Sequence, residues 1–211
     1  MEIKLHYEDA HIVVAEKPFG ICSQEGKGES MVSILSSQLN CKILPVHRLD
    51  TQTTGLIVYA KTKHACTELT KQIQGGVFKK EYFCICHGDI SQRGEMKDFL
   101  YHDKLKNKSF VVASKRMGTK EAILEYTTLE SKEQLNFVRV KLHTGRTHQI
   151  RVQFASRGNV LYGDGKYGAK DNDRIALHSC YLSITHPKTG RQLTWVSQPQ
   201  GGIWDLFIKR S

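Results

Sequence analysis

The chain has 211 residues, of which 39% are hydrophobic and 25% are charged. These values are typical of a globular protein with a real core, and they exclude an intrinsically disordered chain. Lys and Arg outnumber Asp and Glu by 31 to 21, a formal net charge of +10 that favours a polyanionic partner, with nucleic acid as the natural candidate. Because no repeat, low-complexity segment or Pro/Ser-rich linker marks a boundary, residues 1–211 are predicted to form a single domain.

The first third of the chain is predicted to alternate strands and helices. Ser30 precedes apolar residues at helical spacing and can cap a helix. A second helix should stop at Gly75, because glycine readily ends helices. The predicted elements are, in order, a strand at 12–15 that ends at a Pro-Phe-Gly turn, a helix after Ser30, a strand at 56–60 and a helix at 63–74.

Predicted strands dominate the remainder of the chain. They are rich in β-branched and aromatic residues and are separated by Gly, Asn and Lys turns. Runs of strands with few crossover helices indicate an α+β fold with a mixed, largely antiparallel sheet and flanking helices. The predicted strands are 78–87, 110–113, 122–130 and 137–142, followed by a helix at 147–157 and a hairpin of 176–185 with 192–197.

Cysteine usage and the N-terminus point to the cytoplasm. The six cysteines are scattered and are expected to be reduced thiols, and the first residues lack an apolar signal core. Cys84 and Cys86 alternate on a predicted strand, so both can pack as small apolar side chains. No metal site is predicted, because the spacing from His47 to Asp50 is His-x-x-Asp, whereas two-histidine-one-carboxylate iron sites usually begin His-x-Asp.

Asp50 stands out because it lies among basic and hydroxyl residues just before an apolar strand. The segment is His47-Arg48-Leu49-Asp50-Thr51, and Gly55, which follows it, permits a backbone geometry or a close approach that a Cβ would hinder. A loop held by a rigid scaffold is a common place for reactive side chains. The alternative is that Asp50 only caps a turn.

Two segments resemble the RluA-type pseudouridine synthases. His47-Arg48-Leu49-Asp50 before a strand that begins Thr-Thr-Gly-Leu at 53–56 is similar to the family's catalytic segment, and residues 144–152, Thr-Gly-Arg-Thr-His-Gln-Ile-Arg-Val, are similar to a second one. The motifs Lys-Pro-Phe-Gly at 17–20 and Lys-Lys-Glu-Tyr at 79–82 extend the resemblance over about residues 5–196. Two departures are Phe19, where the family usually has a small residue, and Gln153, where His is common.

The resemblance implies that the chain is a single catalytic domain that isomerises uridine in RNA to pseudouridine without a cofactor. The base-to-sugar bond is broken, the base rotates, and its carbon 5 joins the sugar. Asp50 would be the catalytic carboxylate, a role that suits a group able to attack or stabilise an oxocarbenium-like sugar. Arg151 would supply the fixed cation beside Asp50, and Tyr82 would stack on the uracil.

The resemblance also implies RNA contacts around a central RNA-binding cleft. A stacked uridine must be flipped out, and Arg48 is the expected side chain that fills its place. Leu177 would pack beneath the base, and His47 and Arg146 are candidate RNA contacts, although each is also consistent with a structural or backbone-contacting role.

Several alternatives stay open at this level. A catalytically silent RNA-binding protein and a nucleoside-bond hydrolase that uses Asp50 are alternative functions. The substrate is expected to be structured RNA, either ribosomal RNA or transfer RNA, and the protein is expected to be a monomer. The chain is expected to have no room for the extra N-terminal RNA-binding module of larger relatives, so the basic stretch 93–116 is a candidate for target selection.

Overall fold

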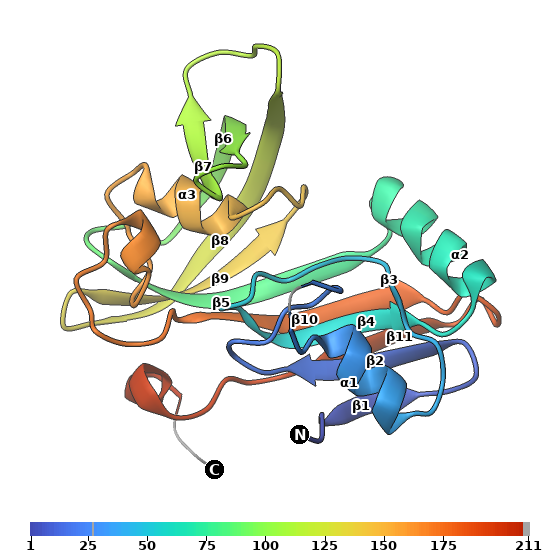
Figure 1. The fold of residues 1–211 in the computed structure, drawn as a ribbon. Helices are drawn as coiled ribbons and strands as arrows, with labels where there is room; N and C mark the ends of the chain where they lie inside the picture. Colours follow the sequence, from blue (N-terminus) through green and yellow to red (C-terminus); the bar gives the residue numbers. More distant parts are fainter. Residues whose placement is uncertain (27, 209–211) are drawn as a thin grey trace. The chain divides into compact units, whose positions relative to one another are not determined.

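The computed structural model describes residues 1–26 and 28–208, and the chain divides into two compact units. Unit 1 comprises Met1–Lys80 and His178–Pro199, and unit 2 comprises Glu81–Leu177 and Gln200–Ser211. Figure 1 shows the helices and strands of both units. The expected single-domain organisation of the chain stays a prediction.

Unit 1 is built on a sheet in which the strand order is β1-β2-β4-β10. Short strand β3 pairs with β4, and β11 forms the predicted hairpin with β10. The β4–β10 pairing is parallel, and the others within this unit are antiparallel. The strands are β1 (Leu5–Glu8), β2 (Ile12–Lys17), β3 (Leu44–Pro45), β4 (Thr54–Ala60), β10 (Leu177–Thr185) and β11 (Gln192–Val196).

Two helices of unit 1 form where local signals predict them. Helix α1 (Met31–Gln38) begins after Ser30, whose hydroxyl accepts a hydrogen bond from the Ser33 amide. Helix α2 (Lys63–Gln74) has the predicted bounds, with Gly75 as its C-cap. Its buried face packs on β2, β4 and β10 to form the core of this unit. No helix in the described part of the chain is long and apolar enough to cross a membrane.

Unit 2 is built on an antiparallel sheet with the strand order β5-β9-β8-β6-β7. Helix α3 packs against this sheet through Val152, which contacts Leu100 of β6 and Ala122 of β8. In Figure 1, β6, β7 and β8 extend together, with α3 beside them. The elements are β5 (Lys79–His87), β6 (Arg93–Asp103), β7 (Lys108–Val112), β8 (Thr119–Lys132), β9 (Leu135–Leu142), α3 (Gln149–Ala155), η1 (Gly165–Tyr167) and η2 (Gly202–Leu206).

The α+β class and the largely antiparallel sheet are confirmed, and several details differ from the sequence prediction. Strand β6 was not predicted at all. Helix α3 begins at Gln149 rather than at residue 147, because His148 at its N-cap has left-handed backbone angles, φ 55° and ψ 26°. Cys84 and Cys86 are buried on β5, and the cysteines are free thiols.

Candidate active site

The loop that carries Asp50 connects β3 to β4 in unit 1 and exposes its residues unequally. Arg48 is exposed, Leu49 is 4% exposed, and Asp50 is half-buried. The Ser23 hydroxyl donates to the Leu49 carbonyl oxygen at 2.8 Å and accepts from the Leu49 amide at 3.2 Å. Leu49 therefore anchors the loop, and the residues on either side of it are left at the surface or close to it.

Lys17 fixes the other side of the loop. Its side chain is fully buried, and its Nζ donates to the carbonyl oxygens of Pro18 at 2.8 Å, Thr51 at 2.9 Å and Thr53 at 2.8 Å. Burial lowers the pKa of Lys17 to about 8, although electrostatic interactions with Cys22 and Asp50 act in the opposite direction and raise it. An ammonium group has three hydrogens, and all three are used on backbone oxygens, two of which belong to residues that follow Asp50. The Lys-Pro-Phe-Gly motif thus supplies a clamp for the Asp50 loop.

A buried network fixes the start of β4, directly after the loop. His178 Nδ1 lies 2.8 Å from Thr54 Oγ1, and His178 Nε2 lies 3.1 Å from Ser197 Oγ. Ser197 donates its one hydroxyl hydrogen to the Glu16 carboxylate, so its oxygen accepts from His178 Nε2. Burial lowers the pKa of His178 to about 4, which keeps the ring neutral. No motif in the sequence indicated this network.

His47 is placed as a packing residue. It is 9% exposed, its Nε2 accepts from the Val58 amide at 3.1 Å, and its ring meets Phe78 edge-on. Burial, with a smaller effect of the Lys80 charge, lowers the pKa of His47 to about 3. These contacts support a structural role, and an RNA contact by His47 stays a prediction.

Arg151 lies on α3 in unit 2 and is held by an acidic partner that the motifs did not indicate. Its Nε donates to Asp164 Oδ2 at 2.7 Å, and its Nη2 donates to Asp164 Oδ1 at 2.7 Å. Both side chains are almost fully buried, at 2% and 1% exposure. The arrangement is a two-pronged, charge-assisted pair that fixes the plane of the guanidinium group. The only sequence signal for Asp164 was an Asp between two glycines.

The Tyr167 ring adjoins the same guanidinium group. The Arg151 Cζ atom lies 5.2 Å from the ring centroid, which is a cation–π distance. The Tyr167 hydroxyl accepts from the Ser109 amide at 2.8 Å and lies 3.0 Å from His148 Nδ1. Arg151 is therefore oriented by the Asp164 carboxylate and by the Tyr167 ring, and a hydrogen bond to Ser109 of β7 fixes that ring.

The other predicted site residues of unit 2 lie on two strands and in one loop. Tyr82 is on β5, opposite Val140 of β9, and is 5% exposed. Leu177 is the first residue of β10, whose other residues belong to unit 1, and is 4% exposed. Arg146 precedes α3, and its Nε donates to the Glu121 carbonyl oxygen at 2.8 Å. The contact of Arg146 is with backbone, and its role in RNA binding stays a prediction.

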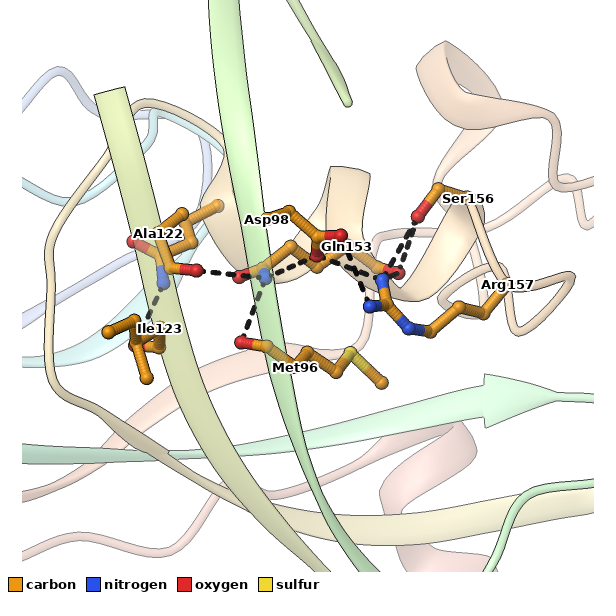
Figure 2. A network of polar contacts seen from close by, with 8 residues as sticks. Met96, Asp98, Ala122, Ile123, Gln153, Ser156 and Arg157 are labelled. Carbon is orange, nitrogen blue, oxygen red and sulfur yellow. Dashed lines mark hydrogen bonds and ion pairs between the residues drawn. The ribbon is translucent and has the colours of Figure 1, made fainter. Parts of the chain in front are cut away.

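Gln153, where the resembled family commonly has His, joins α3 to β6 of unit 2. Its Nε2 donates to the Asp98 carboxylate at 2.7 Å and to the Met96 carbonyl oxygen at 3.1 Å, both on β6. Asp98 also accepts from both terminal nitrogens of Arg157, at 2.9 and 3.2 Å. Figure 2 shows Gln153 and Arg157 meeting Asp98 from the helix side. Gln153 therefore forms hydrogen bonds with β6 at the position where the family commonly has His.

Within the described residues, no group of three or more His, Cys, Asp or Glu side chains is placed to hold a metal ion. Independence from metals and cofactors stays a prediction. Asp50, Arg48 and His47 belong to unit 1, and Tyr82, Arg146, Arg151 and Leu177 belong to unit 2.

The chain is similar to known proteins over most of its length. A model of the RNA pseudouridylate synthase family matches residues 11–156. Ribosomal large subunit pseudouridine synthase D of Pseudomonas aeruginosa is 33% identical over 235 residues, which cover 100% of this chain and 72% of that protein. The protein of the same name from Nitrosomonas europaea is 33% identical, over 92% of this chain and 61% of that protein. The chain thus spans about two thirds of the length of these relatives.

The same fold occurs in a solved structure. The solved structure of human RNA pseudouridylate synthase domain containing 1 superposes with a TM-score of 0.80 at 20% identity, over 94% of this chain and 84% of that chain. The family model and the Pseudomonas relative identify the class of protein as RNA-modifying isomerases. The chain belongs to the RNA pseudouridylate synthase family.

Proposed function

We propose that this chain converts uridine to pseudouridine in RNA, and that its substrate is ribosomal RNA of the large subunit. The observation that carries the proposal is the Asp50 loop, which Lys17 and Ser23 hold from both sides. A fixed and partly accessible carboxylate is what an attack on a sugar or a base requires. The names of the two bacterial relatives support ribosomal RNA rather than transfer RNA. A monomer in the cytoplasm is part of the same proposal.

Asp50 is the catalytic carboxylate in this proposal. It would stabilise or attack the reacting nucleoside while the bond between base and sugar breaks. The reaction then needs no net transfer of water or electrons, because the same base is rejoined through carbon 5. The hydrogen bonds that hold the loop keep Asp50 in position, and this matters because a small displacement of a catalytic group lowers the reaction rate.

Arg151 and Tyr82 complete the proposed catalytic set. Arg151 remains a cation at any working pH, and its guanidinium plane is fixed by Asp164. Its role is to hold the Asp50 carboxylate in its charged form. Tyr82 is assigned the uracil ring, on which a flat aromatic side chain can stack.

The remaining assignments concern RNA binding. Arg48 is exposed beside Asp50, and its long planar side chain suits the space that a flipped base vacates. Leu177 is assigned the packing surface beneath the base, and Arg146 is assigned a contact with the RNA backbone. His47 would act through the loop backbone.

The test maps pseudouridine in RNA from cells with and without this protein, and then assays purified protein on the RNA so identified. Asp50→Asn is expected to abolish isomerisation while RNA affinity stays within a few-fold of the parent. Asp89→Asn, the same chemical change at an exposed residue, should behave as the parent. Pseudouridine formed at the parent rate by Asp50→Asn would refute the assignment. Release of free uracil would indicate a hydrolase, and RNA binding with no product would indicate a silent binding protein.

A further inference from the structure

The hairpin formed by β6 and β7 in unit 2 presents two aromatic rings to the outside. Tyr101 of β6 is directly opposite Phe110 of β7, so both side chains lie on one face. They are 38% and 37% exposed. Their neighbours Leu100 and Ser109 point to the opposite face, where they are 4% and 1% exposed. The hairpin therefore has a buried inner face and an aromatic outer face.

Each of these rings has a cation over it. Lys108 Nζ lies 6.0 Å from the centroid of Phe110, and Arg116 Cζ lies 5.8 Å from the centroid of Tyr101. Residues 101–120 contain six of the chain's Lys and Arg but only one of its Asp and Glu, which gives a local net charge of +5 from 6 minus 1. Half of the net charge of +10 is thus in this segment. We call the outward side chains Tyr101, Lys108, Phe110 and Arg116 the hairpin surface.

The hairpin surface begins next to the ring that contacts Arg151. Lys108 Nζ lies 5.0 Å from the centroid of Tyr167, and Arg151 Cζ lies 5.2 Å from the same centroid. Gln153 of α3 and Arg157, which follows this helix, bind Asp98 at the base of the hairpin (Figure 2). A ligand on the hairpin surface is therefore held at a fixed position relative to Arg151, within one compact unit.

We propose that the hairpin surface binds an unpaired RNA strand that flanks the target uridine. The proposal rests on the proposed function and names a feature of its substrate. Aromatic rings beside cations suit nucleic acid, because bases stack on the rings and phosphates pair with Lys and Arg. The strand must be unpaired, since the faces of paired and stacked bases are covered by their neighbours in a duplex. Local charge of +5 favours this occupant over an apolar protein surface.

The test compares two probes on the full chain: a twelve-nucleotide oligouridine, and the same oligouridine annealed to oligoadenosine. The double variant Tyr101→Leu/Phe110→Leu keeps apolar side chains but removes both rings. It should bind the single strand at least about fivefold more weakly for each ring removed, while duplex binding stays near that of the parent. Leu129→Ala, a change at an exposed apolar residue of β8, should leave both affinities unchanged.

Conservative and charge variants separate stacking from other effects. Tyr101→Phe and Phe110→Tyr keep flat rings and should keep parent affinity. Lys104 and Lys106 are exposed in the turn between β6 and β7, so Lys104→Gln/Lys106→Gln should weaken binding of both probes. On the single strand it should also reduce the slope of log affinity against log salt, by about 0.7 for each phosphate that is no longer neutralised. A 2-aminopurine placed in the oligouridine should be quenched by the parent and not by the double variant.

Two outcomes would overturn the inference. Equal losses of affinity on both probes would mean that the rings only support phosphate binding or packing, and unchanged affinity would mean that the surface serves a different partner. Circular dichroism of each variant shows whether the fold is kept, and the single-ring variants replace the double variant if it unfolds. The binding test does not need turnover, so it can succeed where the proposed isomerisation fails, and the reverse also holds.

Discussion

The orientation of the Arg151 side chain is fixed by residues that lie outside the motifs recognised in the sequence. It is buried on α3, and Asp164 engages its Nε and Nη2 with two short hydrogen bonds. A buried charge of this kind is stable only while it is paired. Asp164 is therefore a positioning residue in the proposed mechanism, because it sets the orientation in which Arg151 can act.

Asp164→Asn is expected to cost both stability and rate. The amide keeps the shape of the side chain but removes the negative charge that Asp164 sets against the buried Arg151 guanidinium group, and removing one partner of a buried ion pair typically costs about 3–5 kcal/mol. Urea unfolding measures the loss of stability, and single-turnover assays measure the fall in rate. Glu121→Gln provides the comparison, because the Lys97–Glu121 pair at 3.3 Å is exposed and should be worth less than about 1 kcal/mol. Similar unfolding curves for the two variants would refute the role given to Asp164.

Two buried histidines of unit 1 link stability to pH. Burial lowers the pKa of His47 to about 3 and that of His178 to about 4, from an ordinary value near 6.5 in the unfolded chain. Between these values the unfolded chain binds more protons than the folded chain. The free energy of unfolding should therefore fall as pH drops below about 6.5, by about 2 kcal/mol for each histidine at pH 5.

Urea unfolding at pH 7.5 and at pH 5.0 measures this dependence. His47→Gln removes one titrating group, so its loss of stability between the two pH values should be smaller than that of the parent by about 2 kcal/mol. His64→Gln, on the surface of α2, should keep the parent's pH dependence. Identical pH dependence in the parent and His47→Gln would show that His47 can be protonated in the folded protein.

At the scale of elements, the sequence predicts best where a local signal sets a boundary. Helix α2 has the predicted bounds because Thr62 caps its start and Gly75 its end. Strand β6 was missed because Arg93–Asp103 contains no β-branched residue and places Met96 and Leu100 four residues apart, as a helix would. The pairing of β6 with β7 and β8 decides its conformation, and the residue propensities of the segment do not contain that information.

Gly55 is predicted to be irreplaceable for the pairing of β4 with β10. Its φ is +102°, and a Cβ there would lie 2.3 Å from the Ser179 carbonyl oxygen. Gly55→Ala should lower the free energy of unfolding by about 3 kcal/mol or more, because it combines backbone strain with a clash against a neighbouring strand. Gly20→Ala is the matched control: φ is +85° but nothing lies within 4 Å, so only about 1–2 kcal/mol of strain is expected. Equal effects of the two substitutions on urea unfolding would contradict the close approach.

At the scale of the whole molecule, the two tryptophans report on different units. Trp195 belongs to unit 1 and packs near Tyr7, and Trp204 belongs to unit 2 and is 8% exposed. Because residues 1–211 are predicted to form a single domain, Trp195→Phe and Trp204→Phe should unfold in urea with the same fluorescence midpoint. Far-UV circular dichroism of each variant controls for an effect of the substitution itself. Two separate transitions would show that the units unfold independently.

The sequence by itself determined the family, the α+β class and the segments that contain Asp50 and Arg151, because these rest on contiguous motifs and on periodicity along the chain. The tertiary structure decided what surrounds those residues. Lys17 clamps the Asp50 loop from a distant strand, His178 reaches Thr54 across parallel strands, and Asp164 orients Arg151 from a separate turn. Such contacts depend on the path of the backbone between distant segments, and a linear pattern of residue types does not record that path.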